Sequence, residues 1–438
     1  MKVAILGYAR QGLSAYKYYS LKGADITVHD QDTDKQVPAG VATKLGPGYL
    51  DNLDEYDVLV RTPYLHPSKI LTANPGSPNI LDKVTTATNE FMDLSSTPII
   101  GVTGTKGKGT TSLLIEAILS EAGYKVALGG NIGISPLDMI DEAEAADYVV
   151  LELSNFQTID MDASPSVGVC LAITPEHLDW HTDYEEYVQA KSQMFGNQAA
   201  SDVAVYAKNN SDSHRAVAGT AATNVLSYAI DGSEASVYIS GDQIMSGGQA
   251  IAKVGDIKLL GVHNQNNVCA AIAATWGILR GNSAPIIAAL HKCTGFEFRL
   301  ETVSKKGGVT YINDSYGSAP EATIAALAAV AQPKVMIIGG HDKGADMGGL
   351  VSALAKSNTT HIVAIGDTGP AIADAVTAIN PGIGVTKDLT TMQSIVEDAA
   401  DHAKRGDAVM LSTGCASFGL FKNFEDRGQQ FNKAVLGL

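Results

Sequence analysis

The segment "PIIGVTGTKGKGTT", residues 98–111, decides the fold of the middle of this chain. A β-branched run leads into glycines and lysines, and the helical pattern "SLLIEAILSEAG" follows. This order predicts a strand, a tight turn and a helix. Because backbone N–H groups at a helix start favour an anion, the turn predicts a phosphate-binding loop with Lys108 along the phosphates. The alternative is a plain glycine turn with an incidental lysine.

The loop departs from the usual spacing G-x-x-x-x-G-K-[ST] at two positions. Val102 holds the place of the first glycine, and Gly109 holds the place of the hydroxyl residue that normally contacts magnesium. Thr110 and Thr111 are then the remaining hydroxyls for a magnesium ion. The loop therefore predicts nucleotide binding with an altered metal contact.

Strand and helix patterns alternate on both sides of this segment. Short buried strands are predicted before it at "KVAILG", "ADITVHD" and "YDVLVRTP", and near the C-terminus at "KVMIIGG", "HIVAIGD" and "AVMLSTG". Strands separated by helix-length segments predict parallel sheets, whereas the turn-rich region from about 202 to 260 predicts antiparallel hairpins. We expect an α/β protein of three domains, residues 1–95, 96–296 and 297–438, in which the central domain has a parallel sheet plus a small antiparallel sheet.

Composition excludes several classes of protein. The net charge of -16 and the pI near 5.0 argue against general affinity for nucleic acid or for an anionic membrane. Four scattered cysteines without a CxxC pair predict buried thiols, a reducing cytoplasm and no metal–thiolate site. We find no signal peptide and no run of 18 apolar residues, so we expect a cytoplasmic protein without membrane insertion.

Polar residues follow two further strands of the central region. Glu152 ends "YVVLELS", and His177 and Asp179 follow "SVGVCLAIT". Because ligands bind beyond the carboxyl ends of parallel strands, these side chains predict a magnesium or manganese site beside the phosphates of ATP. The alternatives are a helix-capping role for Glu152 and a solvated loop position for His177.

The chain resembles the Mur ligases, which are ATP-dependent enzymes that add amino acids to the peptidoglycan precursor. The resemblance covers essentially the whole chain and rests on "GVTGTKGKGTT", "GGNIG", "LELSNFQ", "TPEHLDWHTDYEEYVQAK", "GVHNQNN", "FRLE" and "NDSYGS". Within the family, "LSTGCASFGLFKNFEDRG" is similar to the members that add D-glutamate to UDP-N-acetylmuramoyl-L-alanine. The resemblance implies Rossmann-like outer domains around an ATP-binding centre, an acyl-phosphate and a tetrahedral intermediate, small-molecule substrates and a monomer.

The resemblance also implies which residues contact ATP. Two magnesium ions are expected, held by Thr110, Glu152 and His177 together with Lys191, which the family carries as a carbamate formed with CO2. Asn264 and Asn267 would lie near the adenine, Arg299 near phosphate and Asp314 near the ribose. The phosphate loop would comprise Gly104, Thr105, Lys106, Gly107, Lys108, Gly109, Thr110 and Thr111. Taken alone, Lys191 is a typical surface lysine of an amphipathic helix.

Further residues are implied for the two other substrates. The first domain would bind the UDP end through Gly7, Gly12, Asp30 and Gln31, with Asn131 of "GGNIG" contacting the growing substrate. From the residues alone, "GYARQG" is a weak dinucleotide fingerprint, and a nicotinamide site is its alternative. D-glutamate would be bound by Lys343, Ser417 and Phe424, for which a loop charge, a helix N-cap and core packing are the alternatives.

Three positions depart from the family pattern. Gly109 gives the "KGT" that is reminiscent of folylpolyglutamate synthases, which are relatives without a uridine-binding first domain. Tyr316 stands where a lysine is usual, and Phe298 stands where a histidine precedes the arginine. The other functions considered are therefore a folylpolyglutamate synthase, another amino-acid-adding Mur ligase, and a nucleotide-binding regulator that has lost ligation.

Overall fold

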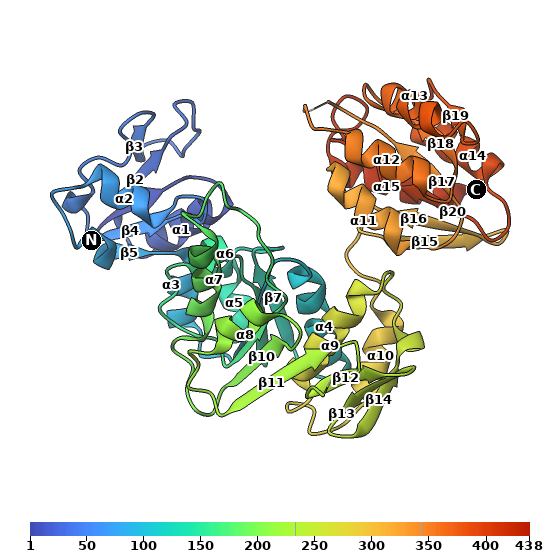
Figure 1. Cartoon of the computed structure of the whole chain (residues 1–438). Coiled ribbons are helices and arrows are strands. Elements are labelled where there is room, and N and C mark those ends of the chain that lie inside the picture. Colours follow the sequence, from blue (N-terminus) through green and yellow to red (C-terminus); the bar gives the residue numbers. More distant parts are fainter. Residues whose placement is uncertain (233, 343) are drawn as a thin grey trace. The chain divides into compact units, whose positions relative to one another are not determined.

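The computed structural model describes residues 1–232, 234–342 and 344–438. These residues fold into two compact units, Met1–Ile257 with Asn264–Lys292, and Lys258–His263 with Cys293–Leu438. The described residues form two sheets in the first unit and one in the second (Figure 1). The expected α/β class is confirmed. None of the helices in the described ranges is both long and apolar enough to span a bilayer.

The N-terminal sheet contains five parallel strands in the order β3-β2-β1-β4-β5. The strand order reverses at β1, whose carboxyl end leads through the turn at Gly7 into helix α1. Such a reversal opens the crevice in which α/β sheets bind ligands. The elements are β1 (Lys2–Leu6), α1 (Arg10–Leu21), β2 (Asp25–Asp30), β3 (Ala42–Leu45), β4 (Val58–Arg61), α2 (Pro67–Ala73), β5 (Val84–Thr85) and α3 (Ala87–Leu94).

The central sheet has nine strands in the order β14-β13-β12-β11-β10-β9-β6-β8-β7. Strand β6 lies between β9 and β8, so the loop that follows it opens among three parallel strand ends. The strands are β6 (Ile99–Thr103), β7 (Val126–Gly130), β8 (Tyr148–Glu152), β9 (Val167–Cys170), β10 (Val203–Ala207), β11 (Asn224–Ala229), β12 (Val237–Ser240), β13 (Gln243–Ser246) and β14 (Gln249–Lys253). The helices are α4 (Lys108–Glu121), α5 (Ile140–Glu144), α6 (Asn155–Thr158), α7 (Tyr184–Ser192), α8 (Ser211–Val217), α9 (His263–Thr275) and α10 (Ala284–Lys292).

The antiparallel strands differ in one respect from the sequence prediction. Strands β12, β13 and β14 pair antiparallel with one another as expected, but they do not form a separate small sheet. Two parallel residue pairs, Tyr228 with Val237 and Ala229 with Tyr238, join β12 to β11 and extend the main sheet. Such a short pairing leaves no periodic signal in the sequence. Figure 1 shows α9 and α10 beside this end of the sheet.

The C-terminal sheet has six strands in the order β15-β16-β20-β17-β18-β19, parallel except for the β15–β16 hairpin. Every residue of β17 is buried, as expected for a parallel strand that is covered on both faces. Helices α11 to α13 supply the core on one face and α14 and α15 the core on the other. The elements are β15 (Glu301–Lys306), β16 (Val309–Asn313), α11 (Pro320–Ala329), β17 (Lys334–Ile338), α12 (Gly348–Lys356), β18 (Thr359–Ala364), α13 (Gly369–Ile379), β19 (Gly384–Thr386), α14 (Met392–His402), β20 (Ala408–Leu411) and α15 (Phe424–Gly437).

Candidate active site

The phosphate loop joins β6 to α4 and requires glycine at two positions. Gly104 has φ 137° and Gly107 has φ 90°, values that residues other than glycine rarely adopt. A Cβ on Gly107 would approach Asn267 Oδ1 to less than 3.0 Å, and one on Gly104 would meet Leu171 as closely. Lys108, the first residue of α4, donates from Nζ to the carbonyls of Gly104 (3.2 Å) and Thr105 (3.0 Å). The Lys108 ammonium therefore lies against the carbonyls of the loop in which the phosphates are predicted to bind.

The two threonines of α4 have different surroundings. The Oγ1 atom of Thr111 is enclosed by protein and lacks a hydrogen-bond partner among the described residues. Thr110 keeps 9% of its surface exposed, whereas Thr111 keeps none. Because a ligand can only reach an accessible oxygen, Thr110 is the hydroxyl better placed for a metal ion or a phosphate. This geometry favours Thr110 as the substitute for the hydroxyl missing at Gly109.

Glu152 and Asn131 lie at neighbouring strand ends and bind each other. Glu152 is 4% exposed at the end of β8, opposite Val102 of β6 in the parallel register. Asn131 Nδ2 donates to Glu152 Oε1 over 2.7 Å, and the Asn131 backbone N–H donates to the Glu152 carbonyl over 2.8 Å. Arg10, which opens α1 in the N-terminal domain, donates from Nη2 to the Asn131 carbonyl over 2.9 Å. The "GGNIG" loop therefore connects the first domain to the carboxylate beside the phosphate loop.

His177 occupies a left-handed turn, with φ 56°, after β9. Its ring contacts Phe156, with 4.7 Å between the ring centroids, and keeps 40% of its side chain exposed. Burial lowers the pKa of His177 below its usual value, and the charges of Lys108 and Lys191 lower it further, against the opposing effect of Glu176. A neutral imidazole is the form that ligates metals. Glu176 also pairs with Lys106 of the phosphate loop.

Lys191 is fully buried on α7, which contradicts the surface-lysine alternative. Its Nζ donates to the Gly104 carbonyl over 3.0 Å and lies 4.5 Å from the centroid of the Tyr187 ring. Within the described ranges it forms no ion pair with a carboxylate. Burial, reinforced by the Lys108 charge, lowers the pKa of Lys191 from 10.5 to about 7. The sequence motif thus places a partly neutral amine directly beneath the phosphate loop.

Asn264 and Asn267 are paired on α9 beside the same loop. Asn267 Nδ2 donates to Asn264 Oδ1 over 2.8 Å, and both side chains are buried. Because the Asn267 amide oxygen lies against Gly107, this part of α9 borders the phosphate loop. The adenine contacts predicted for these two residues stay predictions.

The N-terminal residues Gly7, Gly12 and Asp30 converge on one turn. Gly7 has φ 98°, and a Cβ on Gly12 would approach the Gly7 carbonyl oxygen to less than 3.0 Å. Asp30, at the end of β2, accepts from the backbone N–H of Tyr8 through Oδ2 (2.7 Å) and from that of Asp32 through Oδ1 (3.0 Å). Gln31 beside it is exposed. The carboxylate therefore orders the turn in which the UDP end of the substrate is predicted to bind.

In the second unit, Arg299 and Asp314 lie at the start of the C-terminal sheet. Asp314 accepts from Ser412 Oγ over 2.6 Å and from the Leu300 backbone N–H over 3.1 Å. Burial raises the pKa of Asp314 to about 6, although these hydrogen bonds oppose the shift. The Arg299 guanidinium lies 5.5 Å from the centroid of the Tyr316 ring. Tyr316 thus replaces the usual lysine with an aromatic surface beside the arginine.

The structure describes two of the three residues predicted to bind D-glutamate, Phe424 and Ser417. Phe424 begins α15, is half-buried, and meets Tyr316 edge-on with 5.3 Å between the centroids. Ser417 is buried, but the N-cap of α15 is Asn423, so the helix-capping alternative for Ser417 is wrong. The chain beside Ser417 bonds to the "GGHDKG" segment where the His341 N–H donates to the Ala416 carbonyl over 2.9 Å. Lys343 lies outside the described residues.

Phe298, at the other departure from the family pattern, has a packing role. It is 6% exposed, has φ 62° and lies against Gly428 of α15, where a Cβ would approach the phenyl ring to less than 3.0 Å. Its backbone carbonyl accepts from the Tyr316 N–H over 2.8 Å. The aromatic side chain therefore braces the segment that carries Arg299.

Two groups at the junction of the N-terminal and central domains were missed from the sequence. Arg61 is 1% exposed and forms a bidentate pair with Asp160, at 2.7 Å from Nε and 2.6 Å from Nη2. His66 and His181 both lie within 3.3 Å of Glu186 Oε2. The sequence signal that could have identified Arg61 is its charge, because it ends the otherwise apolar strand "VLVR". Its partner is 99 residues away, which no local pattern shows.

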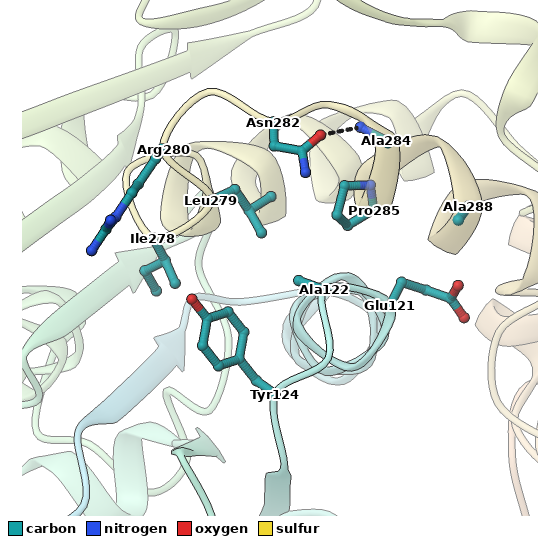
Figure 2. A pocket seen from close by; sticks show the side chains of 10 residues that line it. All are labelled: Glu121, Ala122, Tyr124, Ile278, Leu279, Arg280, Asn282, Ala284, Pro285 and Ala288. Atoms are coloured by element: carbon teal, nitrogen blue, oxygen red, sulfur yellow. Dashed lines mark hydrogen bonds between the residues drawn. The ribbon is translucent and has the colours of Figure 1, made fainter.

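A pocket of about 680 Å³ lies at the other end of α4 from the phosphate loop (Figure 2). Glu121, Ala122 and Tyr124 line it on one side, and Leu279 and Pro285 line it on the other. Figure 2 shows the Asn282 side chain bonded to the Ala284 N–H at its rim, over 3.1 Å. None of the predicted site residues that the structure describes lines this pocket, so it is separate from the candidate active site.

Comparison with known proteins agrees with this arrangement. Residues 102–275 match the Mur ligase middle domain, and residues 298–415 match the Mur ligase, glutamate ligase domain. The chain belongs to the Mur ligase family. It is 36% identical to UDP-N-acetylmuramoylalanine--D-glutamate ligase of Acetivibrio thermocellus, across 99% of this chain and 96% of that protein.

Solved structures share the fold over nearly the whole chain. UDP-N-acetylmuramate-alanine ligase from Thermotoga maritima has a TM-score of 0.61 at 16% identity and covers 100% of this chain and 99% of its own. MurF ligase from the same organism, in complex with ADP, has a TM-score of 0.58 at 19% identity and covers 99% and 94%. The three-domain Mur ligase architecture expected from the sequence is therefore confirmed.

Proposed function

We propose that this protein adds D-glutamate to UDP-N-acetylmuramoyl-L-alanine at the expense of ATP, in the synthesis of the peptidoglycan precursor. The observation that carries the proposal is the phosphate loop with Glu152 at the adjoining strand end and with buried Lys191 of α7 bonded to the loop. The cluster occurs in a chain that matches D-glutamate ligases along its full length. ATP use is consistent with the family and with the ADP complex of a structural relative.

The proposed reaction has two steps. A carboxylate oxygen of the alanyl group attacks the γ-phosphorus of ATP. The bond between this phosphorus and the oxygen that bridges to the β-phosphate breaks, so ADP departs and an acyl phosphate is formed. The amine of D-glutamate then attacks the acyl carbon, and the tetrahedral intermediate expels phosphate while nitrogen loses a proton. Because anions approach each other in both steps, fixed positive charge lowers the barrier. Lys108 and the N–H groups of the loop provide that charge here.

Magnesium fits the donor atoms at this site. Glu152 presents a hard carboxylate oxygen and Thr110 a hydroxyl, and His177 adds a ring nitrogen whose pKa is lowered by desolvation. When bound, magnesium would neutralise phosphate charge. Two ions are proposed, of magnesium or of manganese. An ammonium at Lys191 would repel them, because it is buried within the same cluster.

We infer that Lys191 is carbamylated, because an unprotonated amine is what reacts with CO2. The nitrogen lone pair bonds to the carbon of CO2, and the nitrogen loses a proton to give an anionic carbamate. Full burial, a pKa of about 7 and the lack of a carboxylate partner in the described ranges all suit this modification. The carbamate would add an oxygen ligand where the unmodified side chain offers only a cation.

The acceptor site is proposed in the second unit. D-glutamate needs its two carboxylates held and its amine left free, and Ser417, Phe424 and the Lys343 segment are the proposed contacts. Lys343→Ala should raise the KM for D-glutamate about 10- to 100-fold, the loss of a charged hydrogen bond of about 1.5 to 3 kcal/mol. The KM for ATP should hardly change. An equal loss of ATP affinity would contradict the acceptor assignment.

The deciding experiment is phosphate release from ATP. Release should require both UDP-N-acetylmuramoyl-L-alanine and D-glutamate, and Lys108→Ala should abolish it. Controls replace D-glutamate by L-alanine, L-lysine or diaminopimelate, and the uridine substrate by a pteroate. Better turnover with any of these would refute the substrate assignment. Sedimentation and cell fractionation would test the further proposals of a monomer and of a cytoplasmic location.

A further inference from the structure

Three potential metal ligands meet on the C-terminal unit, among residues that the ligase reaction does not use. Asp398 and His402 lie one helical turn apart on α14, and His361 lies on β18 beneath them. One ligand atom from each residue falls within 4.8 Å of the others. Asp398 Oδ2 lies 4.0 Å from His361 Nε2 and 3.7 Å from His402 Nδ1. The two imidazole rings are stacked, with 3.7 Å between their centroids, so one ring has to turn before both can direct a lone pair at one ion.

The hydrogen bonds leave a ring nitrogen available on each histidine. His402 Nδ1 lies 2.9 Å from the backbone carbonyl of Asp398, which can only accept, so Nδ1 carries the proton and Nε2 keeps its lone pair. Metal-bound histidines commonly donate their other N–H to a backbone carbonyl in this way. His361 Nε2 lies 2.9 Å from the Thr386 hydroxyl, which can donate to it or turn away. Each ring can therefore carry a lone pair on Nε2.

Asp398 supplies the observation that points to a ligand. Its Oδ2 atom is buried and has no hydrogen-bond partner within the described residues. A buried oxygen without a partner destabilises the folded state, and more so when it is charged. The neighbouring imidazoles are too far away for hydrogen bonds, at 3.7 and 4.0 Å. A cation between the three groups would satisfy this oxygen.

The second histidine cluster of the chain lacks such an unsatisfied atom. His66 Nδ1 accepts from the Ser68 backbone N–H (3.1 Å), which leaves Nε2–H to donate to Glu186. His181 Nε2 lies 2.8 Å from the Asn155 amide, and its Nδ1 lies 3.1 Å from Glu186. Each ring nitrogen is already engaged, so a metal ion there would displace existing hydrogen bonds. The comparison singles out the cluster on α14.

We propose that His361, Asp398 and His402 bind a divalent transition-metal ion of the zinc class. Two imidazoles and one carboxylate are a typical donor set for zinc, with water or the Thr386 hydroxyl in the remaining position. Bonds of about 2.0 to 2.2 Å place tetrahedral ligands roughly 3.3 to 3.5 Å apart. Asp398 Oδ2 and His361 Nε2, now 4.0 Å apart, would have to approach each other by about 0.5 to 0.7 Å. The His402 ring, whose side chain is 43% exposed, would have to turn to bring Nε2 to the ion. The ion would tie the last turn of α14 to β18.

Zinc titration of the full-length protein, in competition with a chromophoric chelator, tests the site. His402→Ala and Asp398→Asn should each remove one zinc equivalent or weaken its binding more than about a hundredfold, beyond the roughly 10- to 100-fold that is typical for loss of an outer partner. They should also abolish the part of the zinc-induced rise in Tm that this site causes. Both variants should keep ligase turnover in magnesium near that of the unmodified protein. This turnover would show that the variants fold.

His291→Ala is the matched control. This exposed histidine pairs with Asp256 at 2.9 Å but belongs to no cluster of three metal ligands among the described residues, so its loss should leave zinc stoichiometry unchanged. Zinc binding that is equal in the unmodified protein, His402→Ala and Asp398→Asn would overturn the proposal. An equal loss in His291→Ala would overturn it as well, since binding would then follow surface histidines in general.

Discussion

Recovery of activity by CO2 should follow the pKa of Lys191. With a pKa of about 7, the neutral fraction of the amine is about one tenth at pH 6 and about nine tenths at pH 8. After removal of CO2, the rate of reactivation at a fixed CO2 concentration should therefore rise about tenfold between these pH values and level off above pH 8. An ordinary lysine, with a pKa near 10.5, would instead give a rise of about a hundredfold with no plateau.

The measurement is recovery of phosphate release after bicarbonate is added to CO2-depleted enzyme. Lys191→Ala should be inactive, and added CO2 should not restore its activity. Formate or acetate should restore part of the activity, because either anion can fill the vacated position. Lys334→Met is the control, because Lys334 is 1% exposed and also has a lowered pKa, yet lies in the C-terminal unit. Activity that is independent of CO2, or a hundredfold log-linear pH profile, would refute the reasoning.

Burial of Lys191 also predicts a sign for the pH dependence of stability. The folded amine loses its proton near pH 7, whereas the unfolded side chain keeps it to about pH 10.5. Between these values the unfolded state binds more protons, so the free energy of unfolding of CO2-depleted protein should rise as pH increases. Chemical denaturation at several pH values measures this slope, and Lys191→Met should reduce it.

Two further changes test the junction and the loop. Asp160→Asn leaves the buried Arg61 without its counter-ion and should lower the free energy of unfolding by about 2 to 4 kcal/mol, somewhat below the usual cost because Asp160 is 24% exposed. Lys17→Ala removes an exposed ion pair across the same two domains and should cost less than about 1 kcal/mol in the same denaturation assay; equal effects would contradict the burial argument. Gly107→Ala should raise the KM for ATP in steady-state assays, because φ 90° and the contact with Asn267 both exclude a Cβ, and an unchanged KM would show that the loop relaxes.

Local sequence determined much of the fold and the first candidate residues. A strand, a glycine turn and a helix depend on neighbours within a few residues, so "GVTGTKGKGTT" predicted β6, the loop and α4 in their observed order. The same holds for the Rossmann-like outer domains, whose buried strands and intervening helices have strong periodic patterns. The positions that require glycine, Gly7, Gly104 and Gly107, also follow from turns that the pattern indicates.

Only the tertiary structure decided which residues share an environment. Lys191 reaches the carbonyl of Gly104 across 87 positions, and that burial, rather than any property of its own helix, sets its lowered pKa. Arg61 finds Asp160 across 99 positions, and β12 joins the central sheet through two residue pairs. Such contacts arise from packing of distant elements, where the free energy of burial outweighs local preference. A linear pattern records the preference of each segment but not the partner that completes it.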